Sequence, residues 1–174
     1  IKVVGNNDHI AIRALYPHFQ FPGYQYYVKD GWKNSLLMGA ASGQLGVDDI
    51  SIELKNASAF MCLNLSSDDN VMISQIELTA LASEGSEKMY IPLSGQFYSV
   101  SIPFDDSRPT FEWSNTTTYG DVFLFCDRES EGVILPSEPE SFYMSVPAGD
   151  YPNGFSIEVT DVMGRIYYRR FLKG

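Results

Sequence analysis

The sequence is a succession of short apolar runs that are interrupted by turn-forming residues. Gly, Pro, Asn, Asp and Ser separate these runs at intervals of roughly ten residues. No window of a dozen residues carries apolar side chains at the i, i+3, i+4 spacing of an amphipathic helix. The best helical candidate, residues 35–43, contains two glycines that weaken it. Many short strands without strand–helix alternation predict an all-β fold.

Six runs before the C-terminal region have the length and alternation of strands. In residues 48–56, Ile50, Ile52 and Leu54 share one face, as in a sheet with one buried side. Residues 58–66 are largely apolar on both faces, which predicts a central strand. The other predicted strands cover residues 9–17, 71–81, 95–104 and 119–127.

The mixture of one-sided and two-sided strands favours two stacked sheets over a barrel. We therefore expect a two-sheet β-sandwich of about seven to nine strands with little helix. A length of 174 residues is typical of one domain with a sizeable core, so residues 1–174 are predicted to form a single domain.

The region 141–168 contains the strongest turn signals. Pro147 lacks a backbone donor and is expected to end a strand or to lie at a sheet edge. Residues 151–154, Tyr-Pro-Asn-Gly, predict a turn because Pro presets φ and Gly accepts a positive φ. Residues 161–164, Asp-Val-Met-Gly, predict a hairpin turn between the last two strands.

Two registers are open for this last hairpin. A three-residue loop pairs Asp161 with Arg165 and sets Val159 opposite Tyr167, whereas a four-residue loop sets Val159 opposite Ile166. A slip of one residue would move every side chain to the other face of the sheet. We favour the three-residue loop because it uses the glycine as a left-handed bulge.

The charge balance argues against a nucleic-acid partner. The chain has 12 basic and 22 acidic residues, a net charge of −10 and a pI of about 4.5. Such a surface repels phosphate backbones and bare anionic membranes. No apolar run approaches the roughly 18 residues that a transmembrane helix requires.

The two cysteines are too few for a disulfide-built scaffold. Cys62 and Cys126 each lie within an apolar run, and we expect both to be buried free thiols. Spacing alone leaves a bridge between them open, because it does not reveal the distance between their Cα atoms.

No catalytic constellation is present. The only histidines are His9 and His18, and no Gly-x-Ser-x-Gly motif accompanies them. Acidic pairs at 48–49, 68–69 and 105–106 lack the spacing of a calcium loop and are interpreted as solvated loop tips. We therefore expect a protein that is not an enzyme, with no cofactor and no metal.

An aromatic-rich segment in the least regular region, residues 17–47, supplies the candidate binding residues. Exposed rings can bind a glycan or a partner chain, whereas packing in the core is the alternative. The candidates are Phe19, Phe21, Tyr24, Tyr26, Tyr27 and Trp32.

Several segments, in this order and spacing, resemble the fimbrillin-like proteins of Bacteroides-group bacteria. The fragment LYPHF comes first, followed by ISIELKNASAFMCLNL, VMISQIELTA and LSGQFYSV. The most characteristic segment is SFYMSVPAGDYPNGFSIEVTDVMGRIYY. Together they cover most of residues 9–170.

This resemblance implies a transthyretin-like or Greek-key sandwich that is exported, usually lipid-anchored, and displayed on the outer membrane or built into a fimbria. It also implies that the chain is the N-terminal domain of a longer two-domain surface protein. Subunits of this family add a strand to a neighbour's sheet.

From the resemblance, a non-enzymatic structural or adhesive role at the cell surface is expected, through strand edges and loops. The expected partners are other fimbrial subunits, or a host or bacterial surface protein or glycan. Membrane contact is expected only through a lipid anchor outside this chain. The alternative is a carbohydrate-binding surface lipoprotein that uses the aromatic candidates.

Overall fold

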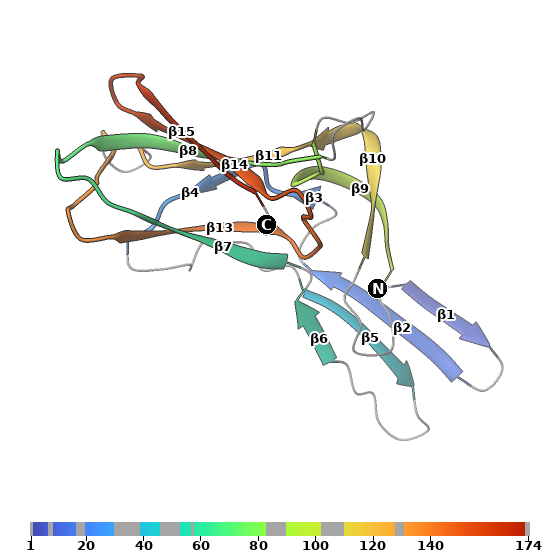
Figure 1. The fold of residues 1–174 in the computed structure, drawn as a ribbon. Coiled ribbons are helices and arrows are strands. Elements are labelled where there is room, and N and C mark those ends of the chain that lie inside the picture. The colour runs from blue at the N-terminus through green and yellow to red at the C-terminus, as the bar shows by residue number, and fades with distance from the viewer. Residues whose placement is uncertain are drawn as a thin grey trace.

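The structure is a computed structural model, and it is all-β. Strands β1 to β15 form four sheets of mainly antiparallel strands, and no described residue is helical (Figure 1). This confirms the predicted all-β class, although the strands are more numerous than the seven to nine expected. The structure describes residues 2–6, 9–16, 20–29, 39–45, 53–56, 58–82, 90–101, 110–127 and 131–172.

The largest sheet has six strands in the order β15-β14-β8-β11-β4, with β12 also paired to β8. All its pairs are antiparallel except β4 and β11, which run parallel. Its strands are β4 (Tyr24–Tyr26), β8 (Met72–Ala80), β11 (Asp121–Phe125), β12 (Val133–Ile134), β14 (Phe155–Asp161) and β15 (Ile166–Phe171).

A two-stranded sheet, β7 (Ser58–Leu65) with β13 (Glu140–Pro147), faces the six-stranded sheet across a common core (Figure 1). In β8, Ile76 and Leu78 are fully buried while Glu77 between them is half-buried, as the period of two in a strand requires. The core also includes Leu63 of β7, Val122 and Leu124 of β11, Phe142 and Met144 of β13, and Ile157 and Val159 of β14.

The prediction that residues 58–66 form a central strand is wrong. Among the described residues, β7 pairs only with β13. Its second apolar face is open to solvent, with Phe60 38% exposed. In β7, apolar side chains on both faces therefore indicate an edge strand and not a strand buried between two neighbouring strands.

The two cysteines are both free thiols, but only one of them is buried. Cys126 lies in the core, where burial, with a smaller contribution from Asp127, raises the pKa of its thiol to about 12. Cys62 is exposed, contrary to expectation, because it points from β7 to the side opposite the core.

A three-stranded sheet, ordered β10-β9-β3, carries an aromatic cluster of its own. Phe21 is buried there, with its ring centre 5.1 Å from that of Phe111 and 5.8 Å from that of Trp113. Phe97 completes the cluster, 5.1 Å from Phe111. The strands are β3 (Gln20–Phe21), β9 (Ser94–Ser101) and β10 (Thr110–Tyr119).

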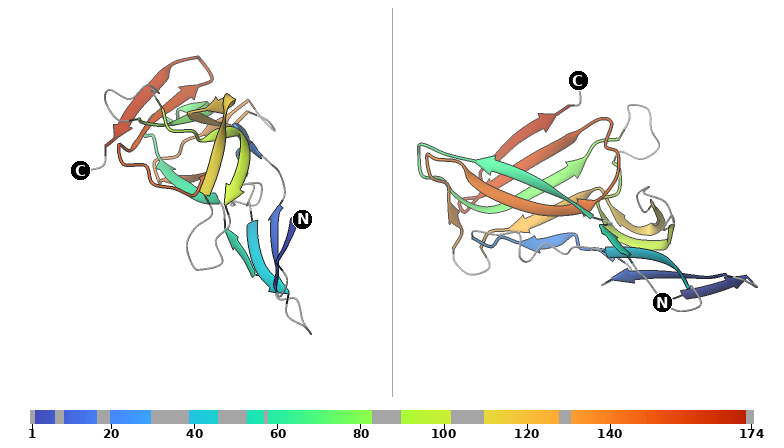
Figure 2. Two further views of the ribbon diagram at one scale, coloured as in Figure 1. Left: turned by 90° about the vertical axis from the view of Figure 1, so that its right-hand side faces the viewer. Right: turned by 90° about the horizontal axis from the view of Figure 1, so that it is seen from below.

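The remaining sheet has four strands in the order β1-β2-β5-β6 and extends away from the other sheets (Figure 2). It includes part of the segment that was the best helical candidate, since residues 39–45 are a strand. Residues 48–52 of the predicted strand 48–56 lie outside the described residues. The strands are β1 (Lys2–Asn6), β2 (His9–Tyr16), β5 (Gly39–Leu45) and β6 (Glu53–Asn56).

The C-terminal hairpin has the three-residue loop that we favoured. The Asp161 N–H donates to the Arg165 carbonyl at 3.0 Å, and Val159 lies opposite Tyr167. Gly164 takes a φ of 80°, the left-handed conformation predicted for the bulge. In the preceding turn, Gly154 takes a φ of 78°, as its sequence predicts.

A buried glutamine joins the two sheets that enclose the core. The Gln25 side chain of β4 donates through Nε2 to the Ser145 carbonyl of β13, and accepts from the Ser145 N–H at Oε1, both at 2.7 Å. Next to it, the Tyr27 hydroxyl donates to Glu140 at 2.7 Å, and its ring centre lies 4.9 Å from that of Phe142. These contacts close the β4–β13 side of the core.

We predict that Gln25→Ala destabilises the fold by about 2–4 kcal/mol, because it removes both buried hydrogen bonds between the Gln25 side chain and the backbone of Ser145. Urea unfolding would measure the loss. The exposed Gln96 on β9 offers a matched control, and Gln96→Ala should change stability by less than about 0.5 kcal/mol. Equal effects of the two substitutions would contradict a bridging role for Gln25.

Candidate functional site

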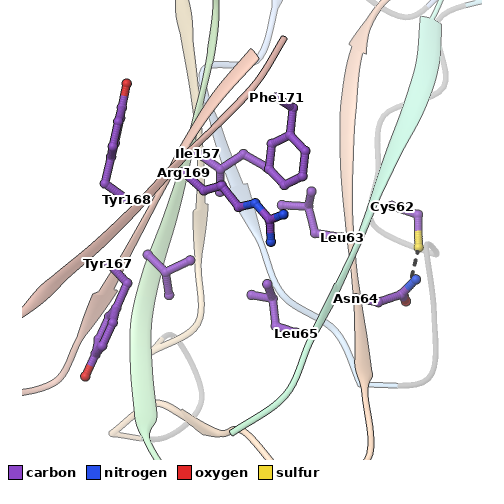
Figure 3. Close-up of a pocket in the computed structure, with 10 residues that line it drawn as sticks. Cys62, Leu63, Asn64, Leu65, Ile157, Tyr167, Tyr168, Arg169 and Phe171 are labelled. Atoms are coloured by element: carbon purple, nitrogen blue, oxygen red, sulfur yellow. Dashed lines mark hydrogen bonds between the residues drawn. The ribbon is translucent and has the colours of Figure 1, made fainter. Parts of the chain in front are cut away.

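A groove lies between β7 and β15, on the side of the core away from Gln25. These two strands are the outermost of their sheets among the described residues, and nothing described pairs with their outer edges. The hollow between them has a volume of about 460 Å³ (Figure 3). It is lined by Cys62, Leu63, Asn64, Leu65, Ile157, Val159, Tyr167, Tyr168, Arg169 and Phe171.

The floor of this strand groove is apolar, and its β15 wall is exposed. Leu63 and Val159 are nearly buried, and they continue the core to the bottom of the groove. The hairpin register places Tyr167, Arg169 and Phe171 on the core-facing side of β15, opposite Val159, Ile157 and Phe155. All three β15 side chains are exposed, because no described strand covers them.

Arg169 brings a cation into this otherwise apolar groove. Figure 3 shows its side chain directed from β15 into the space toward Leu63. The guanidinium carbon lies 5.0 Å from the centre of the Phe171 ring, in a cation–π contact. No carboxylate is among the lining residues. The groove therefore combines apolar surface with one positive charge.

Asp161 holds the hairpin that presents β15. Its Oδ1 accepts hydrogen bonds from the N–H groups of Met163 at 2.9 Å and Arg165 at 2.8 Å, while its Oδ2 accepts from the Arg165 guanidinium. Burial alone would raise the pKa of this carboxyl, but the hydrogen bonds from Arg165 and Met163 outweigh burial and lower the pKa.

We predict that this carboxylate makes the hairpin acid-sensitive. Because the folded pKa is lowered, the stabilisation is complete above the ordinary aspartate pKa of about 3.9 and is lost as the pH falls through the lower folded value. Asp161→Asn should reduce stability at neutral pH and flatten the decline of stability below about pH 4. Urea unfolding from pH 2 to 7 would measure both, and parallel profiles for the two proteins would contradict the role.

A second candidate site is an aromatic strip on the outer face of the six-stranded sheet, formed by Tyr24, Tyr26, Phe123 and Phe125. Tyr24 is 66% exposed and Tyr26 is 42% exposed, because Gln25 between them points inward. The Tyr24 ring centre lies 5.7 Å from Phe123 and 5.8 Å from Phe125, and Tyr26 lies 6.0 Å from Phe125. The planes of Phe123 and Phe125 differ by only 20°. The two exposed tyrosine rings are tilted by 34° to 43° relative to these phenylalanine rings, so the strip forms a continuous aromatic surface.

Polar groups flank the aromatic strip. A hollow of about 620 Å³ beside it is lined by Tyr24, Tyr119, Asp121 and Gln20, among others. Glu77 lies opposite Phe123 on the neighbouring strand. Partial burial, and then the nearby charges of Glu158 and Asp121, raise the pKa of the Glu77 carboxyl. This face therefore offers rings together with hydrogen-bond acceptors.

The structure separates the aromatic residues that the sequence grouped together. Tyr24 and Tyr26 are exposed on the strip, whereas Phe21 belongs to the buried cluster of the three-stranded sheet. Tyr27 is half-buried against Phe142. Phe19 and Trp32 lie outside the described residues.

Sequence reasoning missed the partners of these tyrosines and the whole strand groove. Phe123 and Phe125 alternate with buried residues in the run VFLFC, which could have identified an aromatic outer face. The run IYYRRF is aromatic on both faces, a signal of an edge that could have indicated the groove. The position of β7 opposite β15 across the groove had no signal in the sequence.

Some kinds of site find no support in the part of the chain that the structure describes. No three His, Cys, Asp or Glu side chains there are grouped so as to hold a metal ion. Nor do those residues include a helix with the length and apolar character needed to cross a membrane.

Comparisons of this chain with protein-family models, with curated proteins and with solved structures yield no match.

Proposed function

We propose that the chain is a non-enzymatic structural or adhesive subunit of a cell surface, similar to fimbrillins, that accepts a β-strand from another polypeptide. One observation carries the proposal: the outer edges of β7 and β15 flank an apolar groove that continues the core. The edge strand of a sheet carries backbone N–H and C=O groups that an incoming strand can pair.

The shape of the groove supports a strand in preference to a compact ligand. The hairpin register makes the side chains of β15 alternate: Tyr167, Arg169 and Phe171 face the core side, and Ile166, Tyr168 and Arg170 face the other side, although Tyr168 also lines the groove. Strand addition gives affinity through main-chain hydrogen bonds and specificity through alternate side chains. It would also cover apolar residues that are exposed on β15.

The proposal includes a finer description of the fold. The six-stranded sheet and the β7–β13 sheet would be the two layers of a transthyretin-like or Greek-key sandwich. The shared core of these sheets supports this description. Among the described residues, no strand lies between β7 and β15, and a partner would supply that strand.

The cellular setting is proposed from the sequence resemblance. The protein would be exported to the cell surface, the outer membrane or a fimbrium, and attached through a lipid anchor outside this chain. Its partners would be other fimbrial subunits or surface proteins. The acidic charge of −10 supports a surface role away from nucleic acid.

We predict that groove-facing charges block strand uptake. Leu65→Lys together with Phe171→Lys places two ammonium groups in the groove, and inward-pointing charges prevent edge pairing. Assembly of the purified protein, followed by light scattering and by ladders on a gel, should fall at least about tenfold.

The matched control changes apolar residues on the opposite faces of the same two strands. Phe60→Lys together with Ile166→Lys should leave assembly within about twofold of wild type, because these positions lie on the faces of β7 and β15 turned away from the core and do not line the groove. Equal losses in the two double variants would contradict the proposal. So would a wild-type protein that neither assembles nor shows slower amide exchange in β7 and β15 with strand peptides.

A second candidate function, carbohydrate binding, is favoured by the aromatic strip. Exposed aromatic rings can stack on the apolar faces of sugar rings, while neighbouring carboxylates accept hydrogen bonds from hydroxyl groups. The aromatic strip and the strand groove lie on different strands, so the two functions are compatible.

We predict that Tyr24→Ala lowers the affinity for any glycan selected on an array by at least about tenfold, because it removes the most exposed ring of the strip. Titration calorimetry would measure the change. Tyr98→Ala is the control, since Tyr98 is comparably exposed but lies on β9, outside the strip. An array without binding would eliminate this second function and leave strand acceptance untouched.

A further inference from the structure

We infer that the strand groove selects incoming strands that carry a carboxylate side chain opposite Arg169. The inference rests on the proposed strand acceptance and adds the chemistry of the partner. It follows from the position of one cation in a groove that has no carboxylate of its own.

The register of β15 defines which partner residues matter. An added strand would pair along the free edge of β15, and its groove-facing side chains would lie opposite Tyr167, Arg169 and Phe171. Directly opposed side chains in a sheet have Cβ atoms about 5 Å apart, close enough for an ion pair between long side chains. The groove therefore favours the pattern apolar-x-acidic-x-apolar, with aromatic contacts at both outer positions.

The cost of burial makes the carboxylate important. Arg169 is exposed, and its guanidinium contacts the face of Phe171. A strand laid over the groove would remove this charge from water. Burying an unpaired charge is strongly unfavourable, whereas a bidentate carboxylate can satisfy a guanidinium.

The described carboxylates near this groove cannot serve as internal partners. Asp161 is bound by Arg165 and by two backbone N–H groups at the turn of the hairpin. Glu158 projects from β14 to the opposite face of the sheet, and Glu140 accepts a hydrogen bond from Tyr27 on the closed side of the core. Because none of these described carboxylates is directed at Arg169, we infer that the partner supplies one.

A palindromic peptide tests the pattern without a known partner and without a known strand direction. The probe is dye-labelled Thr-Val-Thr-Glu-Thr-Val-Thr, compared with peptides in which Gln or Lys replaces the central Glu. Fluorescence anisotropy with the whole chain gives each Kd. The Glu peptide should bind about tenfold or more tightly than the Gln peptide, and the Lys peptide should bind most weakly.

Charge reversal supplies the matched variants. Arg169→Glu should invert the order, so that the Lys peptide binds best, and Arg169→Gln should abolish the preference. Arg170→Glu is the control, because Arg170 is the adjacent arginine of β15 and stacks on Tyr168, on the other face. This control should retain the wild-type preference for Glu. Both arginines are exposed, and circular dichroism would verify that the variants fold.

The outcomes distinguish the inference from the function on which it rests. Equal binding of the three peptides, with slower amide exchange in β15, would overturn the role of Arg169 and leave strand acceptance intact. A preference for Glu that Arg170→Glu removes and Arg169→Glu preserves would also overturn it. No binding by any peptide, together with no assembly of the protein, would overturn strand acceptance itself and the inference with it.

Discussion

The paired hydrogen bonds between the Gln25 side chain and the backbone of Ser145 are the interaction on which the rest of the structure depends. A side-chain amide there takes the place of a neighbouring strand, because it offers one donor and one acceptor to one residue of β13. The two sheets are therefore joined on this side without a continuous ladder. Tyr27 strengthens the junction through Glu140 and Phe142. The core is closed along β4 and β13 and stays open along β7 and β15.

The same bridge organises both candidate surfaces. Because Gln25 points into the core, its neighbours Tyr24 and Tyr26 must point outward, where they meet Phe123 and Phe125 of the parallel strand β11. On the other side of the core, no described residue forms a comparable bridge between β7 and β15, so apolar surface and one arginine face the groove. A molecule built in this way has one closed side, one aromatic outer face and one incomplete side.

Much of the fold could be predicted from local chemistry. Residues 141–168 behave as their sequence indicates, because Gly154 and Gly164 take the positive φ values that few other residues tolerate. The register of the last hairpin follows from the same glycine. By contrast, β10 was missed because its Ser, Asn and Thr residues do not alternate with apolar ones, and it is held by the ring contacts of Phe111 and Trp113. The strand 58–66 was misplaced because apolar residues on both faces suit either a central strand or an edge that awaits a partner.

By itself, the sequence determined the all-β class, most strand positions and the turns at residues 151–154 and 161–164, since alternation and backbone conformational preference are local properties. Only the tertiary structure decided which aromatic side chains are exposed and which are buried. Phe21, Tyr24 and Tyr27 belong to one aromatic segment, but the structure separates them. Phe21 lies in a buried cluster, Tyr24 lies on the exposed aromatic strip, and Tyr27 lies at the junction of two sheets. Strand order also decided that Arg169 faces a groove, because the groove exists only where two edges of different sheets approach without pairing. Such proximity joins residues far apart in the chain, as does the contact of Gln25 with Ser145, 120 positions later, and no local pattern encodes either of them.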